Sequence, residues 1–262
     1  MDNILLHFAL IYIIVYLVRM IIDKHTIKKE EKVIKHEPFT TIGKDWLEKI
    51  FDSRQIITIP SRVEHVNEFC NSFEIKPTIF NAILKDDISY NNIHGLKIGE
   101  IACALSQEKV LSDFINSSNL TLLLFEDDNI PFSNSVYKNS EISMEHIKTY
   151  IHDAVIRLPS DWDVLYLGRC WDNCSKNIKI NKYLYKTHRT LCHHAIAFSR
   201  NGAEKILEAI THPLSKPIDH IVANLTVNGT IHSYATIIPI FYQNRDEMSS
   251  TIGNFDHLPV CM

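Results

Sequence analysis

The amino-acid sequence predicts an α/β sandwich with a largely parallel sheet. Two runs of consecutive large hydrophobic residues, 122–125 and 164–167, are typical of strands that are buried on both faces. Segments with apolar residues at helical spacing, such as 98–115, lie between these runs. Strands that alternate with helices along a chain indicate helices packed on both faces of one sheet.

Further elements continue this alternation. A short strand is predicted at 55–59, and Ser61 and Glu64 behind it have the spacing of a capping box at the start of a helix. Residues 201–204 repeat that spacing. The other predicted strands are 163–168, 191–199 and 236–242, and the other predicted helices are 141–158 and one that begins near 216–220.

Length and composition limit the possible functions. With 262 residues and 45% hydrophobic content, the chain can bury a sizeable core, and we predict one folded domain. The net charge of −4 leaves no general basic field, so we expect no nucleic-acid partner. The 7 glycines form no dinucleotide-binding or P-loop motif. A bound phosphate would therefore need a metal ion or side chains to hold it.

The first 22 residues predict a transmembrane anchor. Residues 4–22 are almost continuously apolar, and a helix needs roughly 20 such residues to span a bilayer. Lysines gather between positions 24 and 35, and by the positive-inside rule they place the rest of the chain in the cytosol. We therefore expect a single-pass membrane protein with an anchor at 1–22, a stem at 23–52 and a catalytic domain at 53–262.

The six cysteines are scattered along the sequence. Cys103 falls in a helical pattern and Cys192 in an apolar strand, which favours buried thiols over disulfides. A zinc site is the alternative, and its ligands would be Cys170, Cys174, His193 and His194. The usual Cys-x2-Cys and His-x3-His spacings are absent, which argues against zinc.

Three carboxylates, Glu126, Asp127 and Asp128, directly follow the first buried run. Ligands of open α/β sheets collect at the carboxyl ends of the strands, where these side chains would lie. The Glu-x-Asp spacing lets Glu126 and Asp128 flank one hard divalent cation, Mn²⁺ or Mg²⁺. The alternative is a solvated polar turn that closes the strand.

A second candidate for ligand binding follows the strand at 55–59. The start of the next helix would present free N–H groups near the sheet edge, where Ser61 and Arg62 could meet a nucleotide. The same residues are equally suited to building the fold alone.

Five segments together resemble family 25 glycosyltransferases, the group of lipooligosaccharide and procollagen galactosyltransferases. Each motif is weak alone, but the five occur in register over about residues 55–252. They are Gly-Glu-Ile-Ala-Cys-Ala-Leu-Ser at 99–106, Phe-Glu-Asp-Asp at 125–128, Trp-Asp-Val-Leu-Tyr-Leu-Gly at 162–168, His-Ala at 194–195 with Ser-Arg-Asn-Gly-Ala-Glu-Lys at 199–205, and Pro-Ile-Asp-His at 217–220.

This resemblance implies a GT-A-like fold, as in nucleotide-diphospho-sugar transferases, with a UDP-sugar donor and a divalent metal. It implies inverting transfer of a hexose, galactose or glucose, to a hydroxyl of a glycan, glycoprotein or glycolipid. By position, Glu126 and Asp128 flank the metal and the donor ribose, with Asp127 between them. The family's usual placement is lumenal, against the orientation that the lysines favour.

An inverting displacement also needs a base that takes the proton of the acceptor hydroxyl. Asp219 is the candidate, with His220 and His194 as alternatives. Asp219 would equally suit the first turn of a helix, where a negative charge is favoured. Two other functions fit the sequence: a metal-dependent phosphohydrolase, and a membrane-tethered scaffold with a transferase-like fold but no activity.

Overall fold

The computed structural model describes residues 45–89, 94–131, 143–244 and 248. The chain divides into two units, residues 1–42 and 43–262, and every described residue belongs to the second.

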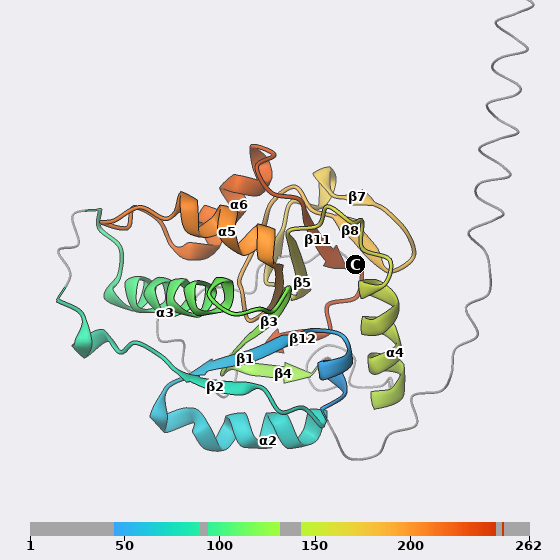
Figure 1. Ribbon diagram of the computed structural model, residues 1–262, viewed down its shortest axis with the longest axis horizontal. Helices are drawn as coiled ribbons and strands as arrows, with labels where there is room; N and C mark the ends of the chain where they lie inside the picture. The colour runs from blue at the N-terminus through green and yellow to red at the C-terminus, as the bar shows by residue number, and fades with distance from the viewer. Residues whose placement is uncertain (1–44, 90–93, 132–142, 245–247, 249–262) are drawn as a thin grey trace, which may run out of the picture. The chain divides into compact units, whose positions relative to one another are not determined.

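A mixed sheet of ten described strands forms the centre of this unit (Figure 1). Eight of the strands follow the order β2-β1-β3-β10-β5-β11-β8-β7, while β12 pairs with β4 and β5. A separate pair joins β6 to β9. The strands are β1 (Ser53–Thr58), β2 (Thr78–Asn81), β3 (Thr121–Glu126), β4 (Asn129–Pro131), β5 (Val164–Gly168), β6 (Trp171–Asp172), β7 (Ile178–Lys179), β8 (Leu184–Lys186), β9 (Thr190–Leu191), β10 (Ala195–Ser199), β11 (Ser233–Thr236) and β12 (Phe241–Gln243).

The direction of the strands confirms the predicted sheet in part. β1 is parallel to β2 and β3, and β11 is parallel to β5. Between these two groups lies β10, which is antiparallel to both β3 and β5, so β3 and β5 point the same way. The sequence did not reveal this reversed strand, because a strand buried on both faces has the same apolar pattern in either direction.

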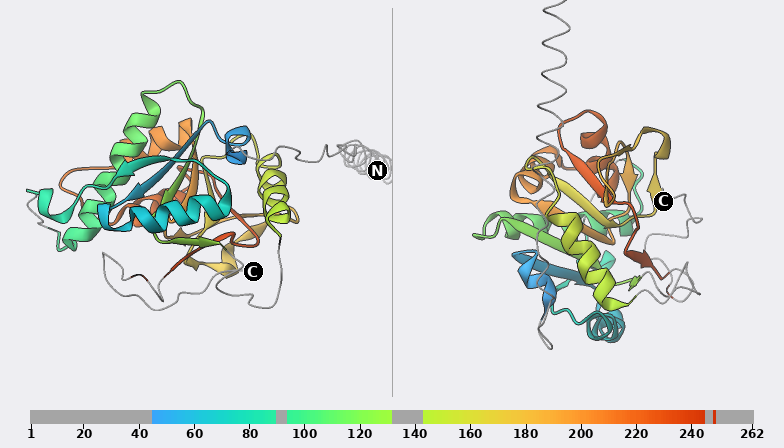
Figure 2. Two further views of the ribbon diagram at one scale, coloured as in Figure 1. Left: turned by 90° about the horizontal axis from the view of Figure 1, so that it is seen from below. Right: turned by 90° about the vertical axis from the view of Figure 1, so that its right-hand side faces the viewer.

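Helices cover both faces of the sheet, which confirms the predicted sandwich (Figures 1 and 2). Along β3, Leu123 and Phe125 face the first core, while Leu122 and Leu124 face the second. The first core packs against α2 (Val63–Phe73) and α4 (Met144–Val155), and the second against α3 (Ile98–Ile115), α5 (Arg200–Ala209) and α6 (Ile218–Val227).

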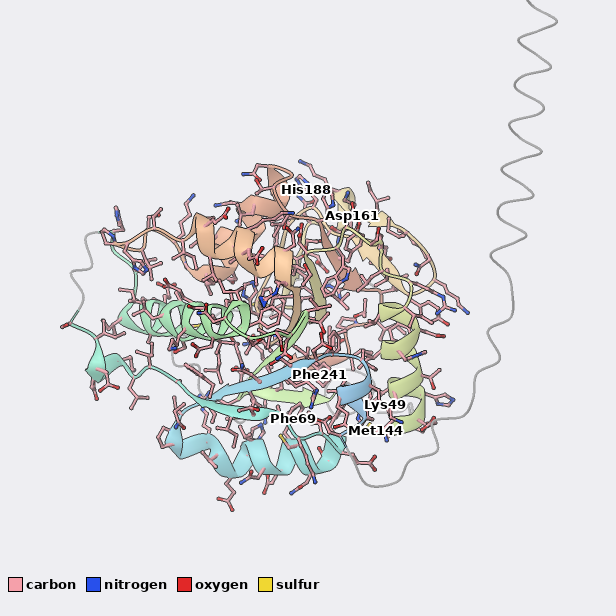
Figure 3. The ribbon with its side chains drawn as sticks, in the orientation of Figure 1. Lys49, Phe69, Met144, Asp161, His188 and Phe241 are labelled. Atoms are coloured by element: carbon pink, nitrogen blue, oxygen red, sulfur yellow. A yellow bond between two sulfur atoms is a disulfide. The ribbon has the colours of Figure 1, made fainter. Side chains whose placement is uncertain are left out.

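An aromatic cluster holds β12 against α2 (Figure 3). The ring of Phe241 lies 4.8 Å from that of Phe73 and 5.1 Å from that of Phe125, measured between centroids. Phe69 packs on the same group, with its centroid 6.0 Å from that of Phe241. The cluster therefore fixes β12, the strand that carries Gln243, next to the end of β3.

The helix starts differ from those predicted. A 3₁₀ turn, Pro60–Arg62, precedes α2, and no side-chain capping bond forms at Arg62, so the predicted capping box is wrong. α5 is capped earlier than predicted, by Ser199, which accepts from the N–H of Gly202 at 3.0 Å. A Cβ at position 202 would lie 2.3 Å from the Asp163 carbonyl oxygen, so only glycine allows this close approach.

Three boundaries also differ. The predicted strand 191–199 is interrupted at Cys192, whose φ is +67°, and forms β9 and β10. The predicted strand 236–242 lies across the gap between β11 and β12. The fold begins before the predicted stem ends, because Trp46 is buried and its indole N–H donates to the Phe73 carbonyl at 2.9 Å.

The predicted localisation needs correction. Within the described ranges 45–89, 94–131 and 143–244, no helix is long and apolar enough to cross a membrane. The longest of them, α3 with 18 residues, is interrupted by charged side chains such as Glu108 and Lys109. The predicted anchor at 1–22 lies outside the described residues. For the part of the chain that is described, the prediction of a membrane-spanning protein is wrong.

Candidate functional site

A cavity of about 260 Å³ opens where β1, β2 and β3 end. It brings together four of the predicted site residues, Arg62, Glu126, Asp127 and Asp128. Apolar residues that follow β2, including Ile83, line it as well. The cavity therefore combines charged side chains with an apolar wall.

The apolar wall is built by hydrogen bonds to its backbone. The N–H of Ala82 donates to the Thr58 carbonyl at 2.9 Å, which extends the pairing of β2 with β1. The N–H of Ile83 donates to the hydroxyl of Ser106 at 2.9 Å, and that buried hydroxyl donates to the Ala102 carbonyl at 2.8 Å. These hydrogen bonds thus hold the segment after β2 against α3.

Asp127 organises the turn between β1 and α2. One carboxylate oxygen accepts from Arg62 at 2.7 Å, and the other accepts from the N–H of Ile59 at 3.1 Å. The side chains of Arg62 and Asp127 are mostly buried, with 14% and 11% of their surfaces exposed. Asp127 therefore holds Arg62 at the cavity, while Glu126 and Asp128 on either side are the carboxylates that could hold a cation.

The carboxyl of Glu126 has a strongly shifted pKa. Burial, followed by the negative charges of Asp128, Asp127 and Asp219, raises its pKa to about 8. A hydrogen bond from the amide of Gln107 to Oε1, at 3.1 Å, acts in the opposite direction. With this pKa the Glu126 carboxyl is mostly protonated at neutral pH, and a bound cation would favour its ionised form.

Gln107 and His193 support Glu126 from behind the cavity wall. Both side chains are buried, and the Nδ1 of His193 lies 2.8 Å from the Oε1 of Gln107. Because the Gln107 nitrogen donates to Glu126, its oxygen must accept, so Nδ1 carries the hydrogen. Burial lowers the pKa of His193 to about 4, opposed by the charge of Asp219. A neutral histidine thus orients the amide that holds Glu126.

Asp128 links the acidic turn to the end of β12. Its Oδ2 accepts from the amide of Gln243 at 3.1 Å, and its carbonyl accepts from the N–H of Asn244 at 2.7 Å. Gln243 also lines the cavity. The placement of Asp128 therefore depends on β12, which the aromatic cluster fixes.

The candidate base Asp219 lies in the first turn of α6 and is half-buried. Its Oδ1 accepts from the N–H of His220 at 2.8 Å, and its Oδ2 accepts from the N–H of Cys192 at 3.2 Å. It does not line the cavity among the described residues, but its charge is near enough to raise the pKa of Glu126. Each oxygen keeps a further lone pair for a substrate hydrogen.

The three remaining predicted residues do not line the cavity in the described part of the chain. Ser61 is exposed and His220 is half-buried. His194 is buried, and its Nε2 lies 3.1 Å from the Phe241 carbonyl, which can only accept. A Cβ at position 168 would lie 2.5 Å from that nitrogen, so Gly168 makes room for the ring. The His194 ring thus has a packing role, between Gly168 of β5 and Phe241 of β12.

The cysteine prediction is wrong for Cys192, whereas Cys103 is a thiol as predicted. Cys170 and Cys192 form a disulfide, so Cys192 is not a buried thiol. Cys103 is a free thiol that points toward Glu126, with 3.9 Å between the sulfur and Oε1. No group of three or more histidine, cysteine, aspartate or glutamate side chains suited to a metal ion occurs among the described residues.

Sequence reasoning missed Gln107 and Gln243. Gln107 had a usable signal, because it lies three and four residues before Val110 and Leu111 on the buried face of α3. A buried amide within an apolar stripe needs partners, and this one bonds to both Glu126 and His193. Gln243 had no comparable signal, because only the pairing of β12 with β4 brings it to Asp128.

No family model and no curated protein matches this chain. Solved structures that resemble it include A197 from STIV, at 13% identity over 78% of this chain and 98% of that chain, with a TM-score of 0.36. A mannose-1-phosphate geranyltransferase from Thermus thermophilus has 7% identity over 72% and 59%, with a TM-score of 0.33. A protein described as a glucose-1-phosphate thymidylyltransferase, from Bacillus anthracis, has 12% identity over 80% and 82%, with a TM-score of 0.36. At these scores the likenesses carry no weight for function, which must be inferred from the site.

Proposed function

We propose that this protein is a metal-dependent glycosyltransferase of the GT-A-like type, which moves a hexose from a UDP-sugar to a hydroxyl of a glycan, glycoprotein or glycolipid. The observation that carries the proposal is the placement of Glu126, Asp127 and Asp128 together with Arg62 at one cavity. Burial and the negative charges of Asp128, Asp127 and Asp219 raise the pKa of Glu126 to about 8. Such a cluster is suited to a cation that neutralises it. The five motifs of family 25 glycosyltransferases in the sequence support the same function.

Glu126 and Asp128 are the residues that would hold Mn²⁺ or Mg²⁺. Two carboxylates fit these ions, which commonly take one or two protein carboxylates and complete their shell with water and substrate phosphates. When bound, the ion neutralises the charge that develops on the leaving diphosphate. The chain has no glycine-rich phosphate cradle to do this.

Arg62 and the apolar wall would bind the rest of the donor. Arg62 is held at the cavity by Asp127 and supplies a fixed positive charge beside the diphosphate. Ile57 and Ile83 line the cavity as well and offer an apolar surface to the nucleoside. These contacts would orient the donor before transfer.

Asp219 would act as the base. The acceptor oxygen forms a bond to the anomeric carbon as the bond to the diphosphate oxygen breaks, and Asp219 takes the hydroxyl proton. The N–H groups of Cys192 and His220 hold the two carboxylate oxygens in place. His194 is less suited to this role, because its Nε2 already donates to the Phe241 carbonyl.

The test is a panel of UDP-sugars with Mn²⁺, scored for UDP release with and without glycan acceptors. We expect acceptor-dependent UDP release that a chelator abolishes. Asp128→Asn should lose donor binding, while Asp219→Asn should keep it and lose about 10²- to 10⁴-fold in transfer rate. Asp113→Asn, on the exposed surface of α3, is the matched control and should behave as wild type. Phosphate release from nucleotides without any acceptor would instead favour the phosphohydrolase.

A further inference from the structure

The Cys170–Cys192 disulfide lies beside the candidate base. Cys170 comes directly before β6 and Cys192 directly after β9, and these two strands pair with each other. The Cα atoms of the two cysteines are 5.6 Å apart. The disulfide thus links the two strands at one end of the pair. One of its cysteines, Cys192, donates its N–H to Asp219.

Cys192 has an unusual backbone. Its φ of +67° lies in the left-handed region, which side chains other than glycine adopt at a cost. Among the described residues, Glu74 is the only other non-glycine with positive φ, and it ends α2, where this conformation is common. Cys192 ends no helix, so its conformation must be held by its surroundings.

The left-handed conformation directs the N–H of Cys192 to Asp219. This N–H donates to Oδ2 at 3.2 Å, while Oδ1 accepts from the N–H of His220 at 2.8 Å. His220 is the next residue in the same helical turn, so its N–H moves with Asp219 itself. Cys192 is therefore the contact that fixes the carboxylate relative to the sheet.

We propose that the Cys170–Cys192 disulfide positions Asp219, by holding Cys192 in the backbone conformation that presents its N–H to the carboxylate. This inference rests on the proposed function, in which Asp219 takes the acceptor's proton. A dithiol such as dithiothreitol would reduce the bond to two thiols while it is itself oxidised to a cyclic disulfide. Cys192 then relaxes to negative φ, its N–H turns away, and transfer slows. The protein is accordingly a transferase whose rate depends on its disulfide.

Three substitutions separate this role from simple stabilisation. Cys170→Ala and Cys192→Ala both remove the disulfide, and each should lower kcat by about 10- to 150-fold, as expected for one lost hydrogen bond to a charged group. The donor KM should stay unchanged. Cys192→Gly also lacks the disulfide, but glycine adopts positive φ without cost, so it should recover most of the rate. A merely structural disulfide predicts the opposite order, because glycine makes the unfolded chain more flexible and the variant least stable.

Cys70→Ala is the matched control, because Cys70 is a free cysteine on α2 and takes no part in the site. Its kcat should equal that of the wild type, both before and after treatment with dithiothreitol. Dithiothreitol should slow the wild type to the rate of Cys170→Ala and leave Cys192→Gly unaffected. If the alanine variants do not fold, this treatment of the wild type and of Cys192→Gly still decides the question.

Two measurements that do not depend on activity complete the test. The amide hydrogen of residue 192 should exchange faster in Cys170→Ala than in the wild type, and unchanged exchange would overturn the inference. Cys174 is also not a free thiol, so peptide mapping of the oxidised protein must find the Cys170–Cys192 pair. A Cys170–Cys174 bond in its place overturns it.

Failure of this inference is distinguishable from failure of the proposed function. If Asp219→Asn transfers sugar at the normal rate, Asp219 is not the base and the disulfide has no base to position. If Asp219→Asn is impaired while Cys170→Ala and Cys192→Ala are normal, the base stands and the role of the disulfide is wrong. The expected result is impairment of all three, with recovery in Cys192→Gly.

Discussion

Two carboxyl groups at opposite ends of the central strands have contrasting surroundings. Asp163, just before β5, is fully buried and accepts from Lys205 at 2.8 Å, from the amide of Asn201 at 2.8 Å and from the N–H of His232 at 2.8 Å. Glu126, the last residue of β3, has one amide donor at 3.1 Å. Its charged neighbours Asp128, Asp127 and Asp219 all raise its pKa.

The difference separates a carboxylate that holds the fold together from one whose surroundings suit it to binding a ligand. Hydrogen bonds and a counter-ion from α5 compensate the charge of Asp163, so this group joins α5 and β11 to the start of β5. Glu126 has the Gln107 amide as a donor, but the charged groups that shift its pKa are all carboxylates, which repel it. Groups with shifted pKa values cluster at functional sites, where a ligand can supply the compensating charge that the protein lacks.

The largest effect on stability is expected from substitution of Asp163. Asp163→Ala should lower the free energy of unfolding by about 3–5 kcal/mol, since it leaves Lys205 and the N–H of His232 without their buried acceptor. Urea unfolding measures this loss. A loss below about 1 kcal/mol, the level of a surface pair, would remove the contrast between the two regions.

In metal-free protein, Glu126→Gln should have the opposite effect and raise the free energy of unfolding. The pKa of about 8 in the folded protein lies above the ordinary glutamate value of 4.5, so the wild type loses stability as pH rises between these values, while glutamine does not titrate. As pH rises from 5 to 8, the free energy of unfolding of the variant should therefore increase by on the order of 3 kcal/mol relative to that of the wild type. Urea unfolding at both pH values, with chelator present, measures the gain. A difference that does not change with pH contradicts the raised pKa.

Gln107→Met should give a smaller effect, of about 1–3 kcal/mol in stability, because it leaves the buried His193 Nδ1–H without its acceptor. If Glu126 holds the metal, Mn²⁺ affinity should fall about 10-fold as well, the usual cost of losing an outer hydrogen bond to a ligand. Titration followed by electron paramagnetic resonance measures the affinity. Unchanged affinity would mean that Gln107 supports the fold alone.

The smallest effect is expected at an exposed carboxylate. Asp113 pairs with Lys109 one turn away on α3, and both side chains are about half exposed. Asp113→Asn should change the free energy of unfolding by no more than about 0.5 kcal/mol. Thermal unfolding at low and high salt measures it, and a larger change would show that exposure does not separate this pair from Asp163.

Local pattern predicted most of the elements and the position of the acidic triplet at the end of a strand. The helix predicted at 98–115 is α3 with the same bounds, because its apolar positions repeat along one face. The acidic triplet lies at the end of a buried strand, as the uninterrupted apolar run before it indicated. Boundaries were less predictable where the signal was one hydroxyl, as with Ser61, because capping depends on the path of the chain before the helix.

The sequence by itself determined which segments are buried, that helices alternate with strands, and that three carboxylates end one strand. These properties follow from hydrophobic periodicity, which is local. Only the tertiary structure decided that Asp127 holds Arg62, that Gln107 supports Glu126, and that Cys192 reaches Asp219. Each of these contacts joins residues from different elements. The contacts form because the strand order β1-β3-β10-β5, with helices packed on both faces, brings segments that are distant in the sequence together.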